Sequence, residues 1–124
     1  MRQERAPLSQ YLRVRQDRGH TVLEFLGEID IAAAEEIVPH LDAATAPPAP
    51  RIVIDLSPVE FLDASGLRLL YRARSRVLAR DGHLSLVCVH PPTLRVLRVV
   101  GLSRLLPPLP TLDDAFRRPE SPAR

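Results

Sequence analysis

The chain has 124 residues, 45% of them hydrophobic and 26% charged, a balance typical of one soluble globular domain with its own core. The formal net charge is +2 and aromatic residues make up 4%, which argues against a nucleic-acid-binding surface, where basic and aromatic side chains are dense. Apart from histidine, every basic residue is an arginine, so active sites that require a lysine are excluded.

Signals of several other protein classes are missing as well. Cys88 is the one cysteine and lies in an apolar run, so we expect a buried small side chain and not a reactive thiol. No Cys/His cluster has the spacing of metal ligands, and we expect neither a metal nor a cofactor. There is no run of about 18 apolar residues, and the N-terminal sequence is not that of a signal peptide. We therefore expect a cytoplasmic protein without a membrane span.

An N-terminal hairpin is predicted first in chain order. Residues 11–17 alternate apolar and polar side chains, and residues 20–27 form a second strand after a turn that contains Gly19. Residues 1–10 are expected to be an arm outside the domain. In the second strand the core candidates are Val22, Phe25 and Leu26.

The first helix is predicted over residues 31–44, which are rich in alanine and glutamate. Pro39 lies inside this segment and is expected to end or kink the helix near Val38, because proline cannot donate the backbone hydrogen bond. A proline-rich loop, residues 45–50, follows.

Two later segments have the composition of fully buried strands. Residues 51–56 contain three consecutive β-branched side chains, and residues 83–89 form a similar apolar run. Such runs are typical of strands covered on both faces in a parallel sheet.

A helix is predicted between these strands, over residues 65–80, and Asp81-Gly82 ends it. Arginines recur every fourth residue from Arg68 to Arg80, and we interpret them as a solvated helix face in preference to a docking site for an acidic partner. The opposite, apolar face is expected to consist of Leu67, Leu70, Tyr71, Val77 and Leu78.

The C-terminal part is predicted to be short elements. A short helix opens at Pro91-Pro92 and ends at Gly101, and residues 104–110 offer at most a brief edge strand. Thr111 is a candidate N-cap for a last helical turn or two. The order of elements predicts an α/β fold: one domain over residues 11–117, with a mixed, mostly parallel sheet and helices packed on it. Residues 118–124 are expected to be a disordered tail.

Asp63, Ala64, Ser65 and Gly66 stand where a strand-rich segment meets the second helix. One interpretation is structural: Asp63 or Ser65 caps the helix, and Gly66 allows a tight entry. The other is functional: a phosphate on Ser65 would lie in the favourable field of the helix N-terminus and would change the surface without unfolding the chain. Neither interpretation excludes the other.

Catalytic readings of the same region fail on spacing. Asp55 follows a buried strand, as in phosphate-accepting receiver domains, but the acidic pair and the lysine of such sites are missing, so Asp55 is expected to cap the Ser57-Pro58 turn. Ser65 is not in a G-x-S-x-G elbow, and no histidine is placed beside it. No glycine-rich phosphate loop is present. We expect no catalytic residues.

Three motifs in order carry a resemblance: Gly27-Glu28-Ile29-Asp30, Asp55-Leu56 and Asp63-Ala64-Ser65-Gly66-Leu67. From about residue 11 to residue 116 the chain resembles the STAS domain and, more narrowly, the bacterial anti-sigma factor antagonists. The resemblance implies a non-enzymatic protein that binds an ATP-dependent serine-kinase anti-sigma factor and so frees a sigma factor. Phosphorylation of Ser65 would end binding, and a serine phosphatase would restore it. The partner-binding residues implied are Asp30, Asp63, Ala64, Gly66, Leu67 and Arg68.

Two alternatives stay open at this point. The chain could be a STAS subunit of a transport ATPase complex or of a stress-signalling scaffold, bound but not phosphorylated. It could instead be a small ligand- or nucleotide-binding domain. Pro39 and Arg68 depart from the pattern expected for the family and bear on which partner is bound.

Overall fold

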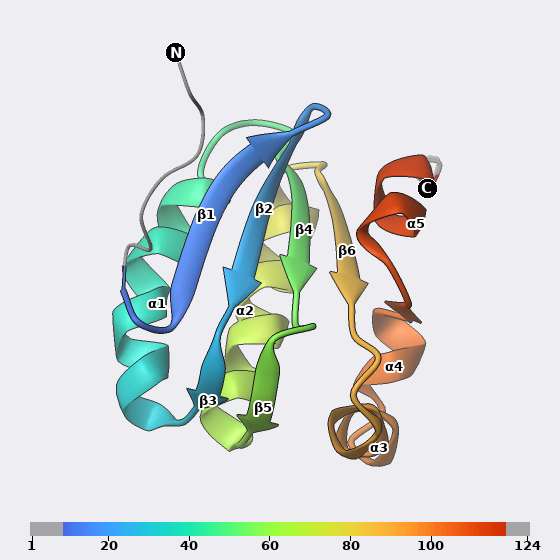
Figure 1. Ribbon diagram of the computed structural model, residues 1–124. Helices are drawn as coiled ribbons and strands as arrows, with labels where there is room; N and C mark the ends of the chain where they lie inside the picture. Colours follow the sequence, from blue (N-terminus) through green and yellow to red (C-terminus); the bar gives the residue numbers. More distant parts are fainter. Residues whose placement is uncertain (1–8, 119–124) are drawn as a thin grey trace.

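A five-stranded sheet forms the centre of the computed structural model, which describes residues 9–118 (Figure 1). The strand order is β1-β2-β4-β6-β7, where β1 pairs with β2 in antiparallel fashion and all other neighbours are parallel. The predicted hairpin and mostly parallel sheet are therefore confirmed. The strands are β1 (Leu12–Asp17), β2 (His20–Phe25), β4 (Arg51–Asp55), β6 (His83–Val87) and β7 (Pro108–Leu109).

The buried strand β4 explains how the sheet is covered on both faces. Ile52 and Ile54 belong to the main core, which lies between the sheet and the helices α1 (Ile31–Ala44) and α2 (Ala64–Ala79). Val53 belongs to a smaller cluster with Ala115 of α5 (Leu112–Arg117), on the other face. Successive side chains of a strand point to opposite faces, so a run of β-branched residues needs both covers.

A second, two-stranded sheet was not predicted. It pairs β3 (Gly27–Ile29) with β5 (Val59–Leu62) in parallel. The strand expected over residues 20–27 breaks because Gly27 adopts a left-handed backbone conformation, with φ of 75°. In Figure 1 the two short strands lie side by side at the end of the molecule where α1 and α2 begin. This small sheet therefore joins the starts of both helices.

Pro39 was predicted to end or kink the first helix near Val38, and it does not end it, since α1 continues to Ala44. A proline leaves the carbonyl group four residues earlier, here that of Glu35, without its usual donor. Both Pro39 and Glu35 are exposed, so water can satisfy that carbonyl. The cost of the proline is thereby reduced.

The predicted apolar face of the second helix is partly wrong. Leu70 and Val77 are buried as expected, but Tyr71 is 40% and Leu78 is 55% exposed. Leu69 and Ala73 are buried in their place. The buried face of α2 is therefore rotated relative to the predicted one. The apolar side chains of α2 spread over more of the helix circumference than α1 and the sheet cover, so some of them remain exposed.

The C-terminal elements follow the predictions with one addition. The short helix α3 (Pro91–Val99) and the edge strand β7 are present, and a further short helix, α4 (Leu102–Leu105), was not predicted. Thr111 caps α5 as predicted, since its Oγ1 accepts from the backbone N–H of Asp114 at 3.0 Å. Most of the expected arm and of the expected tail lies outside the described residues.

Candidate functional site

Two aspartates that the sequence singled out cap the two long helices. Asp30 Oδ1 accepts from the backbone N–H of Ala33 at 3.0 Å and caps α1. Asp63 Oδ1 accepts from the backbone N–H groups of Ser65 at 2.8 Å and Gly66 at 3.3 Å and caps α2. The backbone N–H of Asp63 also donates to the carbonyl oxygen of Ile29 at 3.3 Å. The pairing of β3 with β5 thus places the two caps at the same end of the molecule.

Ser65 is the second residue of α2, and its hydroxyl does not cap the helix. Asp63 has that role, so the structure decides between the two predicted caps. Ser65 is only 9% exposed, and within residues 9–118 its Oγ makes no hydrogen bond. The hydroxyl is therefore available for chemistry that would not remove a structural contact.

Gly66 is required by packing. A Cβ atom at this position would lie 2.7 Å from Leu62 Cγ and 3.2 Å from Ile29 Cγ2, and would come still closer to Leu62 Cδ1. The first turn of α2 therefore sits directly on the ends of both short strands. Gly66 is buried and lies next to Ser65, so its packing helps to fix the position of Ser65.

Ser65 lines an open groove of about 660 Å³ between α1 and α2. Ile31, the first residue of α1, lines this groove and is 64% exposed. The charged side chains at the groove include Glu35 and Arg68. The apolar lining comes mainly from Ile31, Ala34 and Val38 of α1 and from Leu69 and Tyr71 of α2.

The predicted partner-binding residues do not all face solvent. Ala64 and Arg68 are exposed, Asp30, Asp63 and Leu67 are half-buried, and Gly66 is buried. Sequence reasoning missed three exposed apolar side chains of the surrounding elements: Ile31, Tyr71 and Phe61 of β5. No sequence pattern singled out Phe61, because β5 is only four residues long and its two central residues are both exposed.

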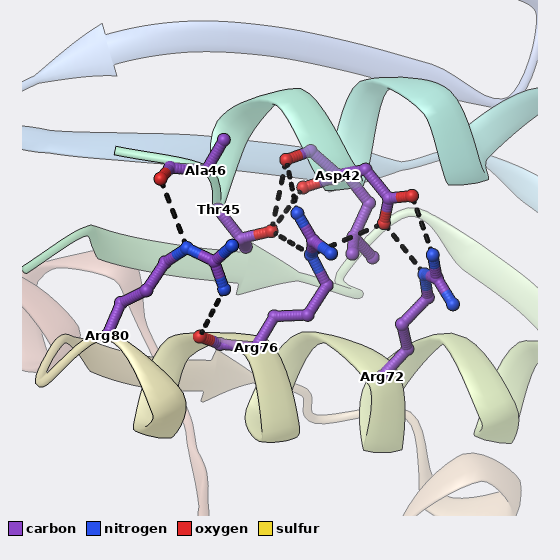
Figure 2. A network of polar contacts seen from close by, with 7 residues as sticks. Asp42, Thr45, Ala46, Arg72, Arg76 and Arg80 are labelled. Carbon is purple, nitrogen blue, oxygen red and sulfur yellow. Dashed lines mark hydrogen bonds and ion pairs between the residues drawn. The ribbon is translucent and has the colours of Figure 1, made fainter. Parts of the chain in front are cut away.

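The arginines from Arg68 to Arg80 were expected to form a solvated face. Arg68 and Arg72 are exposed, but three of the four, Arg72, Arg76 and Arg80, also make polar contacts that were not predicted. Figure 2 shows them reaching across to the C-terminal end of α1. Arg72 donates from Nε and Nη2 to the two carboxylate oxygens of Asp42, at 2.7 and 2.6 Å. Arg76 donates to Thr45 Oγ1 at 2.7 Å and to the carbonyl of Asp42 at 3.0 Å, and Arg80 donates to the carbonyl of Ala46 at 3.1 Å.

These contacts have an electrostatic consequence for Asp42. The hydrogen bonds from Arg72, together with the charge of Arg76, lower the pKa of the Asp42 carboxyl below its ordinary value, although partial burial opposes the effect. Asp42 therefore remains ionised and holds the two helices together at this end. Arg68 has no such partner within the described part of the chain.

Other candidate residues have structural roles. Asp55 is buried and accepts from the backbone N–H of Ser57 at 2.9 Å, which confirms its predicted role in the turn. Cys88 is buried, and burial is the main reason why the pKa of its thiol is raised, so it packs as a small apolar side chain, as predicted. Between residues 9 and 118, no group of three His, Cys, Asp or Glu side chains could hold a metal ion. Over the same stretch, the helices are too short or too polar to cross a membrane.

Comparison with known proteins matches residues 11–115 to the STAS domain. The anti-sigma-F factor antagonist RsfB of Mycobacterium tuberculosis is 33% identical over 111 residues, which are 90% of each chain. A solved anti-sigma factor antagonist from Mycobacterium paratuberculosis is 36% identical, with a TM-score of 0.78, over 89% of this chain and 93% of that one. The Bacillus protein SpoIIAA in its phosphorylated form shares the fold at 24% identity, with a TM-score of 0.67 over 84% of this chain and 95% of that one.

Proposed function

The chain belongs to the STAS domain family, and on that premise we propose that it is an anti-sigma factor antagonist switched by phosphorylation of Ser65. In its unmodified form it binds a serine-kinase anti-sigma factor in the cytoplasm and so releases a sigma factor. It acts by binding and not by catalysis. The observation that carries the proposal is the Ser65 hydroxyl, which is unbonded within the described residues and opens into the groove between α1 and α2.

The groove has the physical character of a docking surface. Ile31 and Tyr71 line the groove and are exposed, and burying such apolar side chains under a partner is favourable. Phe61 of β5 is also exposed but does not line this groove. The two helix N-termini, with Asp30 and Asp63 at their caps, lie at one end of the same region. A partner that covers this end would bury Ser65 almost completely, since only 9% of it is exposed beforehand.

The proposed switch depends on charge. The kinase transfers the γ-phosphoryl group of ATP to Ser65 Oγ, which loses its proton, and ADP is released. The phosphate adds roughly −1.5 to −2 charges at neutral pH. Placing that charge in a covered interface removes its hydration, and the loss is large unless the interface supplies matching cations. The unmodified chain therefore binds and the phosphorylated chain does not, until a serine phosphatase transfers the phosphoryl group to water.

A direct test uses the purified protein and the serine-kinase anti-sigma factors of the same organism. We expect one of them to place a single phosphate on Ser65 in the presence of ATP, as located by mass spectrometry. Calorimetry should show binding by the wild type and by Ser65→Ala. Ser65→Asp should bind at least about tenfold more weakly because it adds a negative charge, although a carboxylate carries less charge than a phosphate.

Ser75 provides a matched control, because it lines the same groove on α2 farther from the helix N-terminus. Ser75→Asp adds the same charge and should weaken binding less than Ser65→Asp does. Equal binding of the phosphorylated and unmodified proteins would overturn the proposal. Recovery of a stable ATPase partner that never phosphorylates Ser65 would favour a transport or scaffold subunit.

A further inference from the structure

Arg68 has a role that the pattern of the family motifs does not assign. We propose that its guanidinium group is the counter-charge for a phosphate on Ser65, so that phosphoserine 65 and Arg68 form an ion pair within α2. This inference rests on the proposed function in one respect only, namely that Ser65 is the residue that carries the phosphate.

The helix N-terminus cannot neutralise the phosphate unaided. A phosphate at the start of a helix ordinarily accepts hydrogen bonds from free backbone N–H groups. Here the N–H groups of Ser65 and Gly66 already donate to Asp63 Oδ1, at 2.8 and 3.3 Å. The phosphate would therefore lie beside a carboxylate that occupies its natural donors, and it needs a cation from elsewhere.

The acidic groups around the site increase this need. Asp63 stands two residues before Ser65, Glu35 of α1 lines the same groove, and Asp30 caps the neighbouring helix. Two further cations at the groove, Arg72 and Arg76, are engaged with Asp42 and Thr45 of α1. Pairing either of them with the phosphate would break the contacts that hold the two helices together.

Arg68 meets the requirements of position and availability. It lies three residues after Ser65 on α2, and side chains three apart on a helix are neighbours. Long helical side chains lean toward the N-terminus, which brings the guanidinium of Arg68 over the turn that contains Ser65. Arg68 lines the same groove, is exposed, and makes no hydrogen bond or ion pair within residues 9–118. An arginine can also hold a phosphate through two parallel hydrogen bonds.

The proposal has a consequence for docking. In the unmodified chain Arg68 has no ion-pair partner among residues 9–118 and is available to an acidic group of the docking protein. In the phosphorylated chain the same cation is engaged by the phosphate. One modification would thus add a negative charge to the docking surface and withdraw a positive one from it.

The test needs no kinase. Phosphoserine is introduced at position 65 of the full chain during synthesis, and the ³¹P resonance is followed as the pH is varied. An arginine paired with the phosphate favours the doubly charged form, so Arg68→Gln should move the titration midpoint upward by about 0.3 pH unit. The titration midpoint of Arg68→Lys should lie between those of the wild type and Arg68→Gln, because lysine retains the charge and loses the paired hydrogen bonds.

Arg95 is the matched control, since it is an exposed arginine on α3, away from the groove. Arg95→Gln changes the net charge equally and should leave the midpoint within about 0.1 pH unit, because distant exposed charges are screened. A midpoint that is the same in Arg68→Gln as in the wild type overturns the proposal, as does an equal shift in Arg95→Gln. Either result leaves the proposed function standing, because that is decided by the binding and phosphorylation experiments.

Discussion

Arginines recur every fourth residue along α2 from Arg68 to Arg80, but those toward its C-terminal end bond to the neighbouring helix and loop, and Arg68 near its N-terminal end does not. At the C-terminal end, Arg72, Arg76 and Arg80 donate to side-chain and backbone oxygens of the last turn of α1 and of the loop after it. At the N-terminal end, Arg68 lines an open groove whose α1 side is mainly apolar. Polar contacts therefore join the two helices toward the C-terminal end of α2, and the groove that Arg72 and Arg76 border extends to Ser65 at the other end.

The difference shows that a repeated residue has no single role along a helix. What each arginine does depends on what the neighbouring helix presents opposite to it. Arg72 and Arg76 bond to Asp42 and Thr45, whereas Arg68 lines a groove that also contains apolar side chains such as Ile31 and Ala34. The contacts toward the C-terminal end of α2 keep the two helices in place, so that the N-terminal end can present a surface of constant shape.

The largest effect is expected near the C-terminal end of α2, from Gly82→Ala. A Cβ atom there would lie 2.6 Å from Pro50 Cδ and 2.8 Å from Pro50 Cγ, and would come closer still to the backbone oxygen of Pro50. Neither a backbone carbonyl nor a proline ring can move aside easily, so we expect a loss of about 3 kcal/mol in the free energy of unfolding. Urea denaturation measures it.

Gly101→Ala is the control for this substitution. Gly101 has a left-handed backbone conformation, with φ of 84°, but a Cβ atom there would meet nothing within 4 Å. Its cost should be limited to backbone strain of about 1 kcal/mol. If both variants lose the same amount, close packing against Pro50 is not what sets the effect at Gly82.

At the N-terminal end of α2, Asp63→Ala should cost about 1.5 kcal/mol, because two backbone N–H groups lose their acceptor. Asp63→Asn should restore most of that stability, since asparagine is an equally good cap. Kinase binding by the asparagine variant then separates two roles. Weak binding in a stable Asn variant would show that the partner needs the charge, and normal binding would show that Asp63 only builds the helix.

Asp30→Ala should cost about 1 kcal/mol, because it removes the single cap bond to Ala33. From sequence, Asp30 was assigned to the partner surface alone, and its capping bond was not foreseen. Thermal unfolding and calorimetric binding of the same variant sharpen the assignment. Stability unchanged within error would show that the cap bond contributes nothing in solution.

The smallest effect is expected from Asp42→Asn, which weakens the contact between α1 and α2. The ion pair with Arg72 is partly exposed, so we expect the melting temperature at pH 7 to fall by only about 3 °C. Because Arg72 lowers the pKa of Asp42 in the folded chain, this stabilisation is present above the unfolded pKa and is lost as the pH falls through the folded pKa. The two proteins should therefore melt at similar temperatures in strong acid, and a difference that persists there would contradict the ion-pair explanation.

The parts of the fold that could be predicted from sequence are those in which a local pattern has one solution. The β-branched run Ile52, Val53 and Ile54 needs cover on both faces, and the structure provides it. Thr111 and Asp55 stand where a cap and a turn need an acceptor, and both have that role. The position of Ser65 at the start of the second helix was also readable.

The remaining features depend on neighbours that are distant in sequence. Asp63 and Ser65 are both good caps, and only the bonds formed show that Asp63 is used. Tyr71 and Leu78 look like core residues until the width of the cover over α2 is known. The strands β3 and β5 are too short to be recognised before their pairing is seen.

The strands β3 and β5 form their own sheet and share no strand pairing with the large sheet, which bears on how this chain could diverge from its relatives. The exposed residues of the small sheet, Glu28, Glu60 and Phe61, can be exchanged while the hydrogen bonds of the large sheet stay intact. Recognition can thus drift independently of the scaffold, and duplicated copies of such a chain could come to serve different regulators without each having to solve the folding problem again.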